Sequence, residues 1–163
     1  MKLRLCDFLT LMNAACGLIS ILLVLLGRFS LAPFFIIAAA LFDLLDGKVA
    51  RMMKTESELG RQLDSLADAI SFGVAPVVLG FGKTQGTFAV IAFTAYLMCG
   101  ILRLARHNVQ KAKGVYFGMP IPLGAIIICV ASLLRLRVIF YPYLFLVLAG
   151  LMISSFRVRK LVK

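Results

Sequence analysis

Long apolar windows recur along the whole chain, and this pattern limits what the chain can fold into. Apolar residues make up 62% of the 163 residues, and the mean hydropathy is +1.02. A soluble domain of this size would lack the polar surface needed to cover so much apolar material. The sequence therefore predicts an all-α, polytopic membrane protein.

Six apolar windows are each near the ~20 residues that a helix needs to cross a bilayer. They cover residues 8–27, 31–51, 61–82, 87–107, 120–136 and 141–156. No internal repeat or low-complexity linker interrupts them. We therefore expect residues 1–163 to form a single domain of six transmembrane helices.

The basic residues are distributed unevenly between the ends of these windows. Of the 18 Lys and Arg residues, all but Arg28, Lys83, Arg135 and Arg137 fall on one side of the predicted membrane. Cytoplasmic loops carry such an excess of Lys and Arg. This predicts a plasma-membrane protein with both termini in the cytoplasm. No basic run is interleaved with aromatic residues, so nucleic acid is not an expected partner despite a net charge of +11.

Four of the seven acidic residues are gathered in a short stretch: Asp43, Asp46, Asp64 and Asp68. Spacings of three and four residues place side chains on one helix face. A turn between the second and third predicted helices would bring the two acidic faces together. The sequence therefore predicts a carboxylate-lined active site at the cytoplasmic ends of helices 2 and 3.

Clustered carboxylates in a membrane need compensating charge. An all-Asp ligand set favours hard cations, namely Mg²⁺, Mn²⁺ or Ca²⁺. The four cysteines are scattered without a C-x-x-C spacing, so no zinc site is expected. Two such metals suit displacement at a phosphoryl centre. A divalent-cation transporter that uses the same Asp cluster is the alternative from a different functional class.

The acidic stretch also resembles the signature of the CDP-alcohol phosphotransferase family at every fixed position. The match is Asp43-x₂-Asp46-Gly47-x₂-Ala50-Arg51-x₈-Gly60-x₃-Asp64-x₃-Asp68. The resemblance implies that Asp43, Asp46 and Asp64 bind two Mg²⁺ or Mn²⁺ ions. It implies that Asp68 is the catalytic base and also touches a metal. It further implies that Gly47, Ala50, Arg51 and Gly60 cradle the CDP moiety of a CDP-lipid.

Two further stretches are similar to the phosphatidylserine synthase branch of this family. The first is "FLTLMNAACGL" at 8–18, in which the resemblance assigns Thr10 and Asn13 to CDP-lipid binding. The second is "RLARHNVQ" at 103–110, followed by "YFGMPIPLGA" at 116–125. One departure is Cys6-Asp7, where relatives often carry Pro-Asn; it puts the nucleotide contact of the first helix in question.

The branch implies transfer of a phosphatidyl or archaetidyl group from CDP-diacylglycerol or CDP-archaeol to L-serine, with release of CMP. Arg103, Arg106 and His107 share one face of the fourth predicted helix and would suit an anionic acceptor. Inositol phosphate and glycerol phosphate would suit them as well, and remain alternatives. The family tendency also predicts a homodimer.

Overall fold

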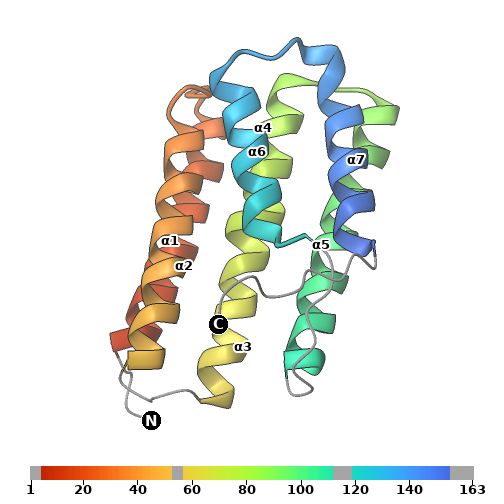
Figure 1. The fold of residues 1–163 in the computed structure, drawn as a ribbon. Coiled ribbons are helices and arrows are strands. Elements are labelled where there is room, and N and C mark those ends of the chain that lie inside the picture. Colours follow the sequence, from red (N-terminus) through yellow and green to blue (C-terminus); the bar gives the residue numbers. More distant parts are fainter. Residues whose placement is uncertain (1–4, 53–56, 112–118, 155–163) are drawn as a thin grey trace.

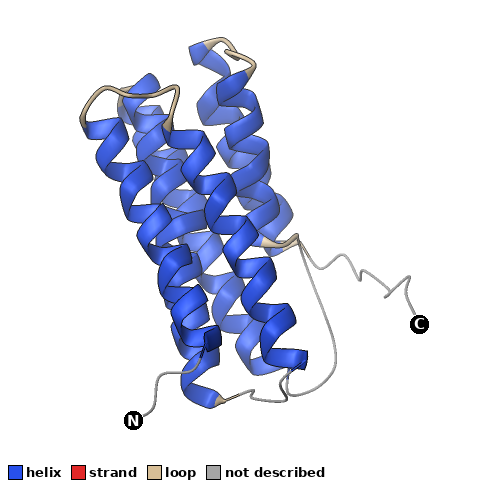
Figure 2. Cartoon of the chain, turned by 90° about the vertical axis from the view of Figure 1, so that its left-hand side faces the viewer, coloured by secondary structure: helices blue, strands red, loops and turns tan. Residues whose placement is uncertain are grey.

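The computed structural model describes residues 5–52, 57–111 and 119–154, and within these ranges the chain is helical with no strand. The helices run along a common direction and form one bundle (Figures 1 and 2). The elements in chain order are α1 (Leu5–Leu25), α2 (Ala32–Met52), α3 (Glu58–Asp68), η1 (Ala69–Val74), α4 (Ala75–Lys83), α5 (Thr87–Lys111), α6 (Ile121–Leu133), η2 (Val138–Phe140) and α7 (Tyr141–Ile153). The predicted all-α class is confirmed.

Three helices are long and apolar enough to cross a membrane: Cys6–Leu25, Glu58–Lys83 and Thr87–Val109. They correspond to the first, third and fourth predicted spans, so the protein is a multi-pass membrane protein. The segments Ile121–Leu133 and Val138–Ile153 are shorter apolar helices. α2 has 21 residues, but its last turns are charged. Six crossings therefore remain a prediction.

The third predicted span consists of α3, η1 and α4 in direct succession, and η1 is a π-helical turn. Ser57 begins this rod with extended backbone, and its side chain accepts a hydrogen bond from the N–H of Gly60 at 3.1 Å. Pro76 lies just after η1. Proline has no N–H to donate to residue 72 and crowds its carbonyl, so a regular α-helix cannot continue through it. The wider turn relieves this conflict.

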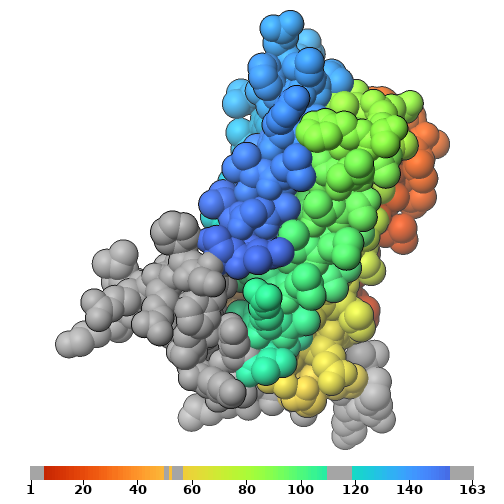
Figure 3. All heavy atoms as spheres, turned by 90° about the vertical axis from the view of Figure 1, so that its right-hand side faces the viewer, coloured from red at the N-terminus to blue at the C-terminus, as the bar shows by residue number. Residues whose placement is uncertain are grey.

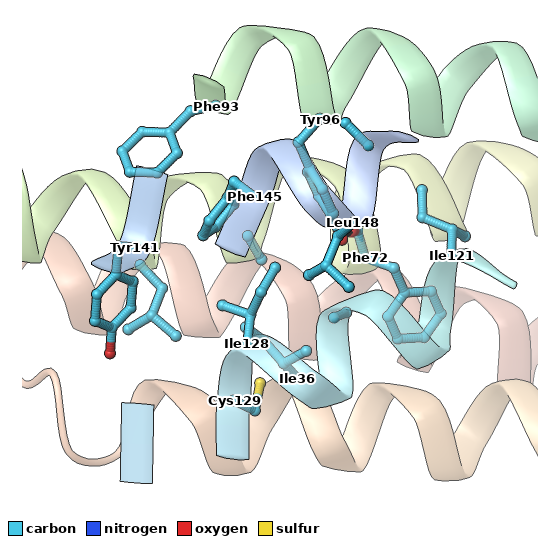
Figure 4. Close-up of a cluster of buried hydrophobic side chains, with 14 of the residues drawn as sticks. Ile36, Phe72, Phe93, Tyr96, Ile121, Ile128, Cys129, Tyr141, Phe145 and Leu148 are labelled. Atoms are coloured by element: carbon cyan, nitrogen blue, oxygen red, sulfur yellow. Dashed lines mark hydrogen bonds between the residues drawn. The ribbon is translucent and has the colours of Figure 1, made fainter. Parts of the chain in front are cut away.

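The centre of the bundle is packed with aromatic and aliphatic side chains from α2, α4, α5, α6, α7 and η1 (Figure 4). Phe145 lies 4.5 Å from Phe93 and 5.0 Å from Tyr96, measured between ring centroids, in edge-to-face geometry. A Cβ on Gly80 would lie 3.0 Å from the Phe145 ring. Small residues at such positions let the helices approach closely.

The outer surface is also apolar. Large hydrophobic side chains such as Leu22, Phe34, Leu66, Ile91 and Val147 are exposed around the bundle. Figure 3 shows one such face, on which α5 and α7 lie side by side. A soluble monomer rarely exposes this much apolar surface. A lipid bilayer is the solvent that suits it.

The two ends of the bundle differ in charge. The described acidic residues other than Asp7 all belong to the second half of α2 or to α3, and Asp7 lies at the start of α1, at the same end (Figure 1). At the opposite end, Lys83 Nζ donates to the carbonyl of Ser132 and lies 3.3 Å from the Tyr141 hydroxyl oxygen. These contacts join α4 to α6 and α7 at that end. The acidic end holds the candidate site.

Candidate active site

The side chains of Asp43, Asp64 and Asp68 converge between α2 and α3. One carboxylate oxygen from each lies within 4.8 Å of the other two. Asp68 is buried, and Asp43 and Asp64 are half-buried. Asp64 and Asp68 are four residues apart on one helix, which places them on the same face. The structure thus brings together three of the four predicted carboxylates.

Asp46 lies outside this group of three and is held by α1 instead. The Thr10 hydroxyl donates to Asp46 Oδ2 at 2.8 Å, and Asp46 is buried. The Thr10 hydroxyl oxygen also lies 3.0 Å from the carbonyl oxygen of Cys6, so the two acceptors share its single proton. Asp46 and Thr10 were assigned to metal and CDP-lipid respectively, and both assignments remain predictions. What the structure adds is their direct contact.

Asn13 on α1 holds Asp68 in a similar way. Its side-chain amide donates to Asp68 Oδ1 at 3.2 Å, and Asn13 is fully buried. The Ser71 hydroxyl donates to the backbone carbonyl of Asn13 at 2.9 Å. Gly17 makes room for this contact, because a Cβ there would lie 2.8 Å from Ser71 Cα. The predicted base is therefore fixed by α1 as well as by its own helix.

The two predicted glycines of the CDP cradle differ in their surroundings. A Cβ on Gly47 would meet no described heavy atom within 4 Å, so there is open space beside α2. A Cβ on Gly60 would lie 3.1 Å from Ser57 Oγ and 3.4 Å from Asp7 Oδ1. Gly60 thus fits a tight helix start, whereas Gly47 faces room that a ligand can use.

Two other residues of the predicted cradle are placed only by their backbone. Ala50 and Arg51 belong to the last turn of α2, at the same end as the carboxylates. Their side chains lie outside the described residues. Their assignment to CDP-lipid binding therefore stays a prediction.

The predicted acceptor residues lie on the last turns of α5. Arg103 is half-buried, and its Nε is buried without a hydrogen-bond partner among the described residues. His107 is half-buried, whereas Arg106 is exposed. The side-chain amide of Asn108 donates to Ser65 Oγ at 2.8 Å and so ties this part of α5 to α3. Of the three predicted acceptor residues, Arg103 has the most enclosed surroundings.

The donor set fits a divalent cation. Three carboxylates at less than 5 Å repel one another in a weakly polar environment unless positive charge lies among them. Oxygen ligands of this kind are those that Mg²⁺ and Mn²⁺ prefer. Asp43, Asp64 and Asp68 would share one such ion, and Asp46 stays a predicted ligand beside them.

Several residues around the site were not assigned by sequence reasoning. Asp7 is buried beside Gly60, although it was noted only as a departure from the family pattern. Ser71, Ser65 and Asn108 make the helix-to-helix hydrogen bonds described above. Ser71 lies in an apolar stretch, where a polar residue needs a partner, and this was the available signal for it. Asp7, Ser65 and Asn108 lie among other polar residues and offered no such signal.

Comparison with known proteins agrees with this geometry. The sequence model of the CDP-alcohol phosphatidyltransferase family matches residues 3–155. The chain is 42% identical over 122 residues to a CDP-diacylglycerol–serine O-phosphatidyltransferase of Methanocaldococcus jannaschii, covering 75% of this chain and 57% of the relative. It is 39% identical over 160 residues to an enzyme of the same name from Saccharomyces cerevisiae, covering 85% and 57%.

A third relative carries a different name. It is an archaetidylserine synthase of Methanothermobacter thermautotrophicus, 40% identical over 127 residues, with 75% of this chain and 54% of the relative covered. The chain thus spans little more than half the length of these curated relatives. The family match covers nearly the whole chain, including every carboxylate of the site. The chain belongs to the CDP-alcohol phosphatidyltransferase family.

Proposed function

We propose that the protein transfers the phosphatidyl or archaetidyl group of a CDP-activated lipid to the hydroxyl of L-serine and releases CMP. The observation that carries this proposal is the convergence of Asp43, Asp64 and Asp68 within 4.8 Å. The names of the relatives, serine O-phosphatidyltransferase and archaetidylserine synthase, favour serine as the acceptor. CDP-diacylglycerol and CDP-archaeol are both candidate donors.

The reaction is a displacement at phosphorus. The serine oxygen forms a bond to the phosphorus that carries the lipid, and the bond from this phosphorus to the bridging oxygen of the diphosphate breaks. CMP leaves with that oxygen. Two divalent ions held by the Asp cluster would supply neutralisation of the diphosphate charge. Asp68 takes the proton from the serine hydroxyl, which is a poor nucleophile while protonated.

The residues of α1 prepare the carboxylates for these roles. Thr10 leaves Asp46 one oxygen that its hydroxyl does not occupy, and that oxygen can bind a cation. Asn13 holds one oxygen of Asp68, which leaves the other to receive the proton. Thr10 and Asn13 therefore serve the predicted CDP-lipid site through the carboxylates that they orient. The space beside Gly47 is the proposed place for part of the CDP moiety.

Arg103 is the proposed partner of the serine carboxylate. A guanidinium binds a carboxylate through two parallel hydrogen bonds. The enclosed position of Arg103 and its partnerless Nε support this role over that of Arg106, which is exposed. His107 remains a proposed neighbour of the acceptor. A phosphorylated acceptor such as inositol phosphate or glycerol phosphate would use the same charge and is the alternative acceptor.

A divalent-cation transporter is the weaker candidate. It would account for the carboxylates but not for the full family signature between Asp43 and Asp68. Membership of a family of phosphatidyltransferases favours chemistry over transport. We further propose six membrane crossings in the plasma membrane, a cytoplasmic site, and a homodimer.

The testing experiment is an acceptor panel. Purified protein in lipid nanodiscs receives CDP-diacylglycerol or CDP-archaeol, Mn²⁺ or Mg²⁺, and one of serine, inositol phosphate or glycerol phosphate, and CMP release is measured. We expect release with serine, and a loss of about 10²–10⁴-fold in Asp68→Asn. Release with a phosphorylated acceptor but not with serine would refute the assignment. Wild-type turnover in Asp68→Asn would show that another residue is the base.

A further inference from the structure

The π-helical turn Ala69–Val74 begins at the residue that follows Asp68. In α-helical register the carbonyl of Phe72 would accept a hydrogen bond from residue 76, which is proline and has no N–H. Within this turn the N–H of Ala75 instead bonds to the carbonyl of Ile70, five residues back. The helix that carries the proposed base therefore changes its register immediately beyond that base.

Tyr96 on α5 supplies a donor for the carbonyl that Pro76 leaves without its usual partner. The Tyr96 hydroxyl donates to Phe72 O at 3.0 Å, and both side chains are fully buried in the core shown in Figure 4. A buried carbonyl is costly without a partner, and a hydrogen bond from a fixed ring hydroxyl also holds it in one orientation. The turn is thus fixed from outside by α5.

The same turn is also the place where α1 docks. Ser71 lies next to Phe72, and its hydroxyl donates to the carbonyl of Asn13 at 2.9 Å. The Asn13 amide then donates to Asp68 Oδ1 at 3.2 Å. A continuous path of hydrogen bonds and one short stretch of backbone therefore connects Tyr96 to the carboxylate of Asp68. Asn13 and Asp68 belong to the predicted site, whereas Tyr96 and Ser71 are in neither the predicted CDP-lipid set nor the predicted metal set.

We propose that Tyr96 is a positioning residue for the transfer reaction, acting through the π-turn, Ser71 and Asn13 to aim Asp68. This inference rests on the proposed role of Asp68 as the base. The Tyr96 hydroxyl itself bonds to protein backbone and has no chemical part in the reaction. Its loss should displace the base without removing a group that binds CDP-lipid. Because a misplacement of about 1 Å can cost ~10²-fold in rate, the effect should appear in kcat.

The test compares Tyr96→Phe with Tyr141→Phe in the full chain. Each change removes one hydroxyl from a fully buried tyrosine, but the Tyr141 hydroxyl lies beside Lys83 at the opposite end of the bundle. Thermal unfolding, binding of CDP-lipid, and kcat and KM for serine are measured for both. We expect both variants to be less stable than wild type. Only Tyr96→Phe should lose kcat, by about 10- to 100-fold, with CDP-lipid binding and KM for serine unchanged.

A double-mutant cycle with Ser71→Ala tests the path itself. If Tyr96 acts through the turn and Ser71, the two changes should be non-additive in kcat, since residues in one hydrogen-bond network couple. Additive losses, or a wild-type kcat in Tyr96→Phe, would overturn the proposal. If Tyr96→Phe fails to fold, Ser71→Ala alone must show the same loss of kcat at unchanged CDP-lipid binding, and wild-type kcat there overturns it. Asp68→Asn is measured in the same assay. If it loses turnover while Tyr96→Phe does not, the role of Tyr96 is refuted and the proposed base is kept; if it also keeps turnover, the proposed base is refuted.

Discussion

At the scale of single residues, the site is defined by which carboxylate oxygens are already engaged by protein donors. Asp46 and Asp68 each accept one hydrogen bond from α1, from Thr10 and Asn13 respectively. Such partners orient a ligand and fix which of its oxygens remains for a metal or a proton. Thr10 gives a test of this hydrogen bonding, and Gly47 gives a test of the open space beside α2.

Thr10→Val should weaken the metal dependence of the reaction. It removes the hydroxyl that donates to Asp46 at 2.8 Å while keeping the shape of the side chain. Loss of such a second partner of a metal-ligating group typically costs 10–100-fold in metal affinity or activity. We expect the Mn²⁺ concentration for half-maximal CMP release to rise by roughly that factor. Thr10→Ser, which keeps the donor, is the matched control and should titrate like the wild type.

Gly47→Ala separates a packing role from a ligand role. No described heavy atom lies within 4 Å of the added Cβ, so the fold should tolerate it. If the CDP moiety occupies this space, the methyl group should raise the Kd for CDP-lipid about 10-fold or more, equivalent to about 1.4 kcal/mol. Isothermal titration with the lipid in nanodiscs measures this. Wild-type affinity would mean that the open space beside Gly47 lies outside the nucleotide site.

The residue scale also shows how far sequence reasoning reaches. The spacing of Asp64 and Asp68 correctly predicted a shared face, because side chains four residues apart on a helix are neighbours. The spacing of Asp43 and Asp46 also predicted a shared face, but it could not show that Asp46 accepts a hydrogen bond from α1. Its position involves Thr10, 36 residues away along the chain. A contact of that range is invisible in local periodicity.

At the scale of elements, the close approach of α1 to η1 is the contact that we propose aligns Asp68, the proposed base. Gly17 and Ser71 form this contact, and Asn13 lies one helical turn before Gly17. Pro76 lies within the third predicted span. Proline leaves a backbone carbonyl without its usual donor, and other donors nearby affect whether the helix kinks, breaks or forms a π-turn. Here Tyr96 on α5 donates to the carbonyl of Phe72, and local sequence patterns do not show such a contact between helices.

Gly17→Ala should destabilise the protein, because its Cβ would lie 2.8 Å from the backbone Cα of Ser71. Overpacking of this kind typically costs about 1–3 kcal/mol. Gly150→Ala is the control, since no heavy atom of the described residues lies within 4 Å of its added Cβ and alanine is favoured over glycine inside a helix by ~0.5–1 kcal/mol. Unfolding in detergent should therefore shift in opposite directions for the two variants. If Gly17→Ala were as stable as the wild type, α1 and η1 could move apart to accommodate the methyl group without a cost in stability.

At the scale of the whole molecule, the charges divide the bundle into two unlike ends. The carboxylates lie at one end, and Arg28, Lys83, Arg135 and Arg137 belong to the other (Figure 1). In membrane proteins an excess of Lys and Arg is found on the cytoplasmic side. The end that holds these four basic residues has fewer of them, so we expect it to face away from the cytoplasm. The sequence predicted this division directly, because charge positions need no tertiary information.

The orientation in the membrane can be measured by cysteine labelling. In a variant without the native cysteines, Arg137→Cys should react with a membrane-impermeant maleimide in intact cells, because Arg137 is exposed at the end opposite the site. Gln62→Cys, exposed on α3, should react only after permeabilisation. The reverse labelling pattern would show the opposite orientation, with the carboxylates on the outer side of the membrane.

The central claim is that the carboxylates gathered between α2 and α3 hold the metal ions for phosphatidyl transfer. The most direct measurement is CMP release from CDP-lipid and serine as a function of Mn²⁺, for wild type and Asp64→Asn in the same nanodiscs. The account predicts a saturable rise for the wild type, none in chelator, and a loss in Asp64→Asn that added Mn²⁺ does not restore. Wild-type release in chelator, or near-normal release by Asp64→Asn, would contradict it.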